Sequence, residues 1–177
     1  MYEKFGQFID GKWQASSDNQ TYDVINPATE ELIGKASKAT SKDVDNALNS
    51  ANRGLEVWKN TAPWQRSYTL RKIADKMREK QDILAKWMTL EVGKPFVEAK
   101  GEVGASADIF EWNAEETKRI YGQTVESRFK DTRVHIHYQP VGVVAALSPW
   151  NFPLVLSSRK ISTALAAGCS VIIKPDV

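Results

Sequence analysis

The end of the chain carries the pattern that most constrains its fold: a strand, a helix and a second strand in close succession. Residues 141–147 form a short apolar run rich in β-branched side chains, which is typical of a buried strand. The proline-containing segment 148–153 breaks this run, and 154–167 has the apolar spacing of a helix that Gly168 ends. Residues 170–173 read as another buried strand. Such a succession predicts a βαβ crossover with parallel strands, the beginning of an open α/β sheet.

Two polar residues, Asn151 and Lys174, follow the predicted strands at the ends where open α/β sheets bind ligands. The Asn151 amide is a donor that does not titrate, and such a donor can stabilise an oxyanion. The alternative is an asparagine that serves only the turn between Pro149 and Pro153. Lys174 is placed to hydrogen-bond a nucleotide ribose, or simply to extend its ammonium group into water.

Composition indicates a globular protein with one core. The chain has 177 residues, 42% hydrophobic and 26% charged, and its net charge of +2 is too small to indicate a nucleic-acid or anionic membrane partner. No apolar run approaches the roughly 20 residues of a membrane span, and residues 1–5 lack a signal-peptide core. The single cysteine excludes an intrachain disulfide. We therefore expect a cytoplasmic protein that binds neither nucleic acid nor membrane.

The N-terminal region, 1–120, predicts short strands followed by helices. Asp10-Gly11 is typical of the two-residue turn of a hairpin spanning 8–13. Two further strands are expected in a small edge sheet with this hairpin, and helices are then expected to follow. The expected strands span 22–25 and 32–36, and the expected helices begin near 40, 63, 83 and 97, the last ending near 120.

Residues 133–139 alternate strictly between polar and apolar side chains, which predicts a half-buried antiparallel strand. Paired with 122–127, it would form a projecting two-stranded arm. A ribbon of this kind is barely stable alone, so its apolar face should require a partner.

Several segments of the chain closely resemble the NAD(P)-dependent aldehyde dehydrogenases, and the resemblance covers nearly its whole length. The most specific is the Pro-Trp-Asn-Phe-Pro element within 139–153, and 166–175 matches as well. The earlier markers are 8–13, 25–29, 90–95 and 111–122. The markers at 90–95 and 111–122 are most similar to the succinate-semialdehyde branch.

The resemblance implies a domain organisation. Residues 1–120 would supply the N-terminal strands and helices of a Rossmann-like cofactor-binding domain, and 140–177 would supply its first βαβ unit. The segment 121–139 would be an arm through which homo-oligomers form. The chain would be the N-terminal portion of the family fold, without the catalytic domain.

The resemblance also implies roles for single residues. Asn151 matches the side-chain half of the oxyanion hole, and Lys174 matches the lysine that binds the adenosine ribose. Arg159 matches an arginine that holds the substrate carboxylate in succinate-semialdehyde relatives; the alternative is a solvated basic pair formed with Lys160. The nucleotide groove would be lined by Leu147, Ser148, Pro149 and Trp150; core packing is almost as good an explanation for Trp150.

The cofactor implied is NAD or NADP. Many NAD-preferring relatives carry glutamate three positions after this lysine, where it repels a 2′-phosphate; Val177 removes that repulsion, so NADP should be tolerated. Cys169 opens a buried strand with no base placed near it, and we interpret it as a small buried hydrophobe rather than a nucleophile. His135 and His137 are interpreted as solvated strand residues, so no metal site is expected.

The family oxidises a small-molecule aldehyde to a carboxylate, and succinate semialdehyde is the candidate substrate here. In family members the nucleophilic cysteine and the general-base glutamate lie downstream of the region that this sequence matches. The 177-residue chain alone is therefore expected to be inactive. The alternative is a non-catalytic binding or assembly module that retains half a nucleotide site.

Overall fold

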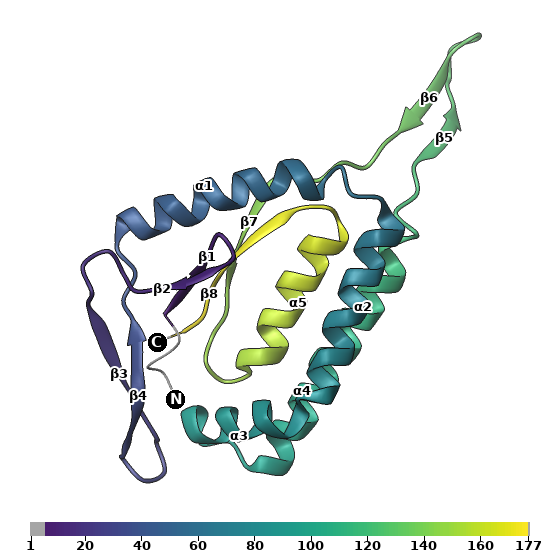
Figure 1. Cartoon of the computed structure of the whole chain (residues 1–177). Coiled ribbons are helices and arrows are strands. Elements are labelled where there is room, and N and C mark those ends of the chain that lie inside the picture. The colour runs from purple at the N-terminus through teal and green to yellow at the C-terminus, as the bar shows by residue number, and fades with distance from the viewer. Residues whose placement is uncertain (1–5, 177) are drawn as a thin grey trace.

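The computed structural model describes residues 6–176. The expectations that rest on residues 1–5 and on Val177 lie outside this described range. The described chain combines helices with four two-stranded sheets, and one of these sheets is parallel (Figure 1).

The N-terminal strands form two separate antiparallel ribbons rather than the single edge sheet that the sequence suggested. In the first ribbon, β1 (Gln7–Ile9) pairs with β2 (Lys12–Gln14), and in the second β3 (Thr21–Ile25) pairs with β4 (Leu32–Ser37). The first turn has φ values of 54° at Asp10 and 74° at Gly11, which a two-residue primed turn requires. The predicted hairpin is thus confirmed.

Four helices follow, and each begins within two residues of its predicted start. Pro63 opens the second helix, where its missing N–H costs nothing, and Gly93 ends the third in the left-handed conformation with φ 74°. The fourth helix ends three residues earlier than predicted. The helices are α1 (Ser41–Trp58), α2 (Pro63–Glu79), α3 (Gln81–Val92) and α4 (Phe96–Thr117).

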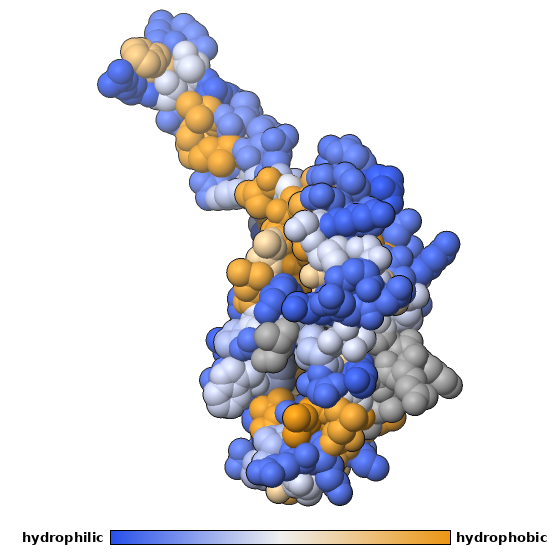
Figure 2. Space-filling model, turned by 90° about the vertical axis from the view of Figure 1, so that its left-hand side faces the viewer, coloured by the Kyte–Doolittle hydropathy of each residue, from blue (hydrophilic) through white to orange (hydrophobic). Residues whose placement is uncertain are grey.

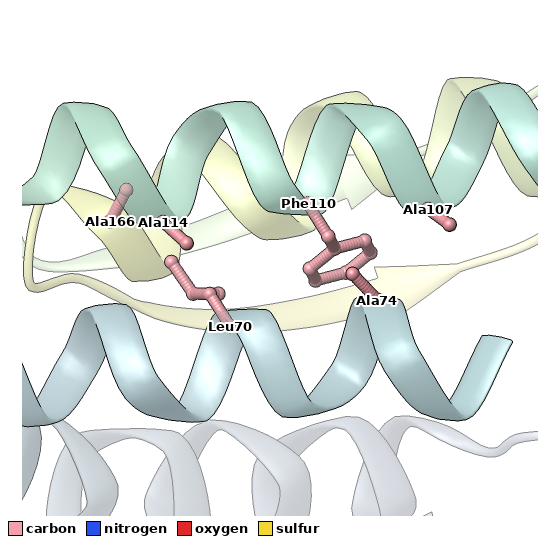
Figure 3. Packing of buried hydrophobic residues seen from close by; sticks show 6 residues of the cluster. All are labelled: Leu70, Ala74, Ala107, Phe110, Ala114 and Ala166. Atoms are coloured by element: carbon pink, nitrogen blue, oxygen red, sulfur yellow. The ribbon is translucent and has the colours of Figure 1, made fainter. Parts of the chain in front are cut away.

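The core lies where α2, α4 and the later helix α5 (Pro153–Ala166) meet. Leu70 and Phe110 fill the space between these helices, and alanines on all three allow the backbones to approach closely (Figure 3). The cluster comprises Leu70, Ala74, Ala107, Phe110, Ala114 and Ala166. A second cluster joins α3 to α4 through Ala85, Met88, Ala99 and Val103. These clusters fix the position of α5 relative to the helical layer.

The predicted βαβ crossover is confirmed. Strand β7 (Val143–Leu147) pairs in parallel with β8 (Ser170–Lys174), and α5 connects them. Helices α1 and α5 both pack on this pair and flank it in Figure 1. The strands are less buried than their apolar sequences suggested, because Ala146 and Ser170 alone are buried among their residues. In this chain the pair has no further strand beside it among the described residues.

The predicted arm is also present. Strand β5 (Gln123–Glu126) pairs with β6 (Arg133–Ile136), and the ribbon projects away from the body (Figure 1). The expectation of a half-buried strand is wrong for the chain by itself, since every residue of both strands is exposed. Figure 2 shows hydrophobic patches along the arm among hydrophilic ones. Its exposed apolar side chains include Val125, Phe129, Val134, Ile136 and Tyr138.

A buried carboxylate, Asp43, ties α1 to the N-terminal ribbons. Thr40 and Asp43 form a reciprocal capping box at the start of α1, and Asp43 also accepts the Ser17 N–H at 3.1 Å and a Gln7 side-chain N–H at 3.3 Å. The Thr40 N–H, at 2.9 Å, contributes most to lowering the pKa of Asp43 from 3.8 to about 2.

Because the folded state lowers this pKa, Asp43 stabilises the protein above about pH 4, and this contribution is lost as pH falls toward about 2. Asp43→Asn should therefore lower the thermal midpoint at neutral pH, and the difference from the parent chain should shrink between pH 4 and pH 2. Circular dichroism melts at several pH values measure this. Asp45→Asn, at an exposed position of α1, is the control. A difference that stays constant with pH would contradict the assignment.

No helix within residues 6–176 is both long enough and apolar enough to cross a membrane.

Candidate functional site

The candidate site is the turn that joins β7 to α5, at the carboxyl end of the parallel pair. Leu147 and Lys174 are register partners at the last positions of the two strands. The Ser148 N–H then donates to the Lys174 carbonyl at 3.2 Å, which extends the ladder by one bond. The fold therefore brings together the strand ends that the sequence analysis singled out, although they lie far apart along the chain.

The side chains around this turn are largely open. Asn151, Pro149 and Lys174 are exposed, and Leu147 and Trp150 are 63% and 65% exposed. Trp150 therefore does not pack in the core that this chain forms by itself. An exposed amide donor and an exposed ammonium group at one sheet end can bind the oxygens of a polar ligand.

Ser148 differs from the rest of the turn because it is 7% exposed. Among the residues that the structure describes, its hydroxyl group has no hydrogen-bond partner. Its contribution to the turn is made through the backbone.

The start of α5 is capped by a residue from another helix. The N-cap Phe152 supplies no side-chain hydrogen bond, Pro153 has no N–H, and the Leu156 N–H already donates to the Phe152 carbonyl. The free donors of the first turn are therefore Leu154 and Val155. Both donate to Oε1 of Glu102 on α4, at 2.9 and 3.1 Å.

Glu102 is buried, with 1% of its side chain exposed. Its negative charge lies at the positive end of the α5 dipole, where a carboxylate is favourable. Its other oxygen, Oε2, forms an ion pair with the Lys94 ammonium. Both carboxylate oxygens are therefore satisfied, as a buried charge requires.

Lys94, in the connection between α3 and α4, binds the turn itself. Its ammonium donates to the Asn151 carbonyl at 3.0 Å and lies 3.7 Å from the centroid of the Phe152 ring. Only 10% of its side chain is exposed. Glu102 and Lys94 thus hold the backbone that follows the Asn151 side chain, at the Asn151 carbonyl and at the first turn of α5.

Neither residue is among those that the sequence singles out. Lys94 lay inside the marker 90–95, where nothing indicated a contact with the distant turn. Glu102 carried a usable signal, since it is a charged residue next to Val103 and three positions after Ala99, on the apolar face of its helix. The α5 amides that it binds, however, are 52 and 53 residues away in sequence.

The far end of α5 is fixed as well. The Cys169 N–H donates to the Ala164 carbonyl at 2.9 Å, and the Gly168 N–H donates to Leu165 at 3.0 Å, with Gly168 at φ 86°. This is a Schellman closure, and it requires the left-handed conformation that glycine adopts easily. The Trp58 indole N–H donates to the Leu165 carbonyl at 2.8 Å. The crossover helix is therefore anchored at both ends.

Other candidate residues lie apart from the turn. Arg159 is exposed on α5, six residues beyond Pro153 and hence about 9 Å further along the helix axis. Cys169 is buried with 2% exposure, the environment of an inert structural thiol. His135 contacts Thr124 across the arm at 3.0 Å. Within the described range, no cluster of three or more His, Cys, Asp or Glu side chains could hold a metal ion.

Comparison with known proteins shows the class. Residues 13–177 match the aldehyde dehydrogenase family, and the chain belongs to it. A glutarate-semialdehyde dehydrogenase of Pseudomonas aeruginosa is 44% identical over 168 residues, which are 95% of this chain and 35% of that protein. An NADP(+) succinate-semialdehyde dehydrogenase of Escherichia coli is 43% identical over 94% of this chain and 35% of its own length. The resemblance to the semialdehyde branch is thereby confirmed.

Solved structures agree with this assignment. An NADP-dependent enzyme of E. coli superposes with a TM-score of 0.93 at 43% identity, covering 95% of this chain and 35% of that one. Betaine aldehyde dehydrogenase of Staphylococcus aureus, in a complex with NAD+, gives a TM-score of 0.92 at 35% identity, covering 96% of this chain and 35% of its own. The chain thus spans about a third of the length of the relatives it matches.

Lys94→Met should strongly destabilise the fold, because it leaves the Glu102 charge buried without its cation. Breaking a buried pair in this way costs about 3–5 kcal/mol. Lys100→Met, which removes an exposed partner of Asp82, is the matched control and should cost at most about 1 kcal/mol. Urea unfolding followed by circular dichroism measures both variants. Equal stability of the two variants would contradict the role given to Lys94.

Proposed function

We propose that this chain is the N-terminal, cofactor-binding part of an NAD(P)-dependent aldehyde dehydrogenase that oxidises a semialdehyde to a carboxylate. The observation that carries this proposal is that Asn151 and Lys174, both exposed, follow or end the two strands of a parallel βαβ pair at its carboxyl end. It is supported by 43–44% identity to proteins named as glutarate- and succinate-semialdehyde dehydrogenases. Succinate semialdehyde is our candidate substrate, and the cytoplasm is our proposed location.

In this proposal Asn151 donates its side-chain N–H to the oxygen of the aldehyde as negative charge develops there. A donor of this kind contributes about 3–4 kcal/mol to transition-state stabilisation. The amide is suited to this because it remains a donor at every physiological pH. Arg159 would hold the carboxylate of the semialdehyde, brought near by parts of the site outside this chain.

Lys174 would hydrogen-bond the adenosine ribose of the cofactor. The groove beside it would be formed by Leu147, Ser148, Pro149 and Trp150, with Ser148 acting through its backbone. The bound NAD or NADP would accept the hydride. Both cofactors are represented among the relatives, NADP(+) in the name of one and NAD+ in the crystal of another.

The chain by itself is proposed to be inactive. Aldehyde oxidation in this family needs a thiolate that attacks the carbonyl, and a base that assists hydrolysis of the thioester. The single cysteine of the sequence is Cys169, which is buried and immediately precedes β8, at the opposite end of that strand from the turn. In this proposal the residues of this chain bind and orient the cofactor and the aldehyde, and the nucleophile and the base come from the rest of the enzyme.

We further propose that 1–120 and 140–177 belong to the cofactor-binding domain and that 121–139 mediates homo-oligomer formation. The exposed apolar side chains of β5 and β6 support this assignment. They also favour the second candidate function, a non-catalytic assembly module that docks on a longer subunit. Co-purification of a longer family member with the chain would favour the module.

Lys174→Met tests the proposed nucleotide site. Loss of a hydrogen bond from a charged group costs about 1.5–3 kcal/mol, so affinity for NAD and NADP should fall by roughly tenfold or more. Isothermal titration calorimetry measures it. Lys35→Met, at an exposed lysine on β4, is the control and should leave affinity unchanged. Equal affinity in the parent chain and Lys174→Met, or no binding by the parent chain, would contradict the proposal.

A further inference from the structure

Burying the charges of Lys94 and Glu102 costs free energy, and the hydrogen bonds of the pair go to the turn at Asn151 and to the first turn of α5. Desolvating two charges is repaid only when both are fully paired. Here one Glu102 oxygen accepts the Leu154 and Val155 N–H groups, and the other pairs with Lys94. The Lys94 ammonium also reaches the Asn151 carbonyl. The pair therefore grips the backbone at Asn151 and again just beyond Pro153.

We propose that Lys94 and Glu102 are positioning residues that set the direction of the Asn151 side chain. Glu102 fixes where α5 begins, and Lys94 fixes the peptide plane that follows Asn151 and covers the Phe152 ring. Neither residue has to touch an aldehyde or a nucleotide. The catalytic consequence rests on the function proposed above, whereas the positioning itself is a property of this chain.

Positioning matters here because a donor stabilises an oxyanion only when it is aimed at the place where charge develops. Asn151 lies in an exposed bend, outside any helix or strand that would fix its backbone. Without an anchor, such a segment would sample several directions, and a displacement of about 1 Å is enough to weaken catalysis severely. The buried pair supplies the missing anchor.

A pair that served only overall stability would behave differently. Asp82 and Lys100 offer the comparison, since this ion pair at 2.7 Å also involves a residue of α4, joining it to α3, but is solvent-accessible and does not contact the turn. Its removal should leave the turn unchanged. If Lys94 and Glu102 served only to stabilise the fold, their removal would accelerate hydrogen exchange throughout the core rather than at the turn alone.

The experiment compares three double variants by amide hydrogen exchange and NMR, on the 177-residue chain without nucleotide or aldehyde. Lys94→Met with Glu102→Leu removes both charges and the acceptor while keeping the site filled. Lys94→Met with Glu102→Gln keeps an acceptor for the α5 amides but loses the bond to the Asn151 carbonyl. Asp82→Asn with Lys100→Met is the control.

In the Leu variant the Leu154 and Val155 amides should exchange faster by about tenfold or more, while core amides such as those of Leu70 and Ala107 keep their rates. The chemical shifts of the Asn151 side-chain NH₂ group should move toward those of a side chain that samples several directions. In Lys94→Met with Glu102→Gln, the Leu154 and Val155 amides should again be protected from exchange, because the glutamine oxygen accepts their N–H groups. The Asn151 resonances should stay shifted. The control should match the parent chain.

Three results would overturn the proposal. The first is that exchange at Leu154 and Val155 is unchanged and the Asn151 resonances do not move. The second is that exchange accelerates equally at every core amide. The third is that neither Lys94→Met with Glu102→Leu nor Lys94→Met with Glu102→Gln folds. Nucleotide affinity is measured separately on the same samples. Loss of positioning in a chain that binds no nucleotide would leave this inference standing and reject the proposed function, so the two failures are distinguishable.

Discussion

The structure depends on a single buried carboxylate, Glu102, at the start of the crossover helix. A charge in this position must be fully paired, and its partners come from two other segments of the chain: the connection that carries Lys94 and the first turn of α5. The pairing fixes where α5 begins. Because β7 leads into that helix and β8 follows it, the carboxylate also sets the end of the parallel pair where Asn151 and Lys174 lie.

Packing among the helices also holds α5 in place. Alanines on α2, α4 and α5 let the three helices approach closely, with Phe110 and Leu70 filling the remaining space. The Schellman closure at Gly168 and the Trp58 bond to Leu165 then fix the far end of α5. The crossover helix, anchored at both ends, therefore carries an exposed turn.

Local signals predicted most of the fold because each depends on residues within a turn or two. The positive φ values at Asp10 and Gly11, and the Thr40–Asp43 box, follow from neighbouring residues alone. Burial was harder to predict, since an apolar run does not reveal whether a covering element is present, and β7 and β6 are both more exposed than expected. The placement of Asn151 and Lys174 at the strand ends could be predicted from the sequence. The contacts of Lys94 and Glu102 with the turn and with α5 could not, because those partners are distant in sequence.

The most direct test of the central claim is the formation of reduced nicotinamide by the purified chain, its mass verified, with succinate semialdehyde and NADP in excess. We predict that nucleotide binds and that no cofactor is reduced, because the one thiol of the sequence, Cys169, is buried away from the turn. Turnover that disappears in Cys169→Ser would contradict the account. The chemistry would then have to be reassigned to that cysteine.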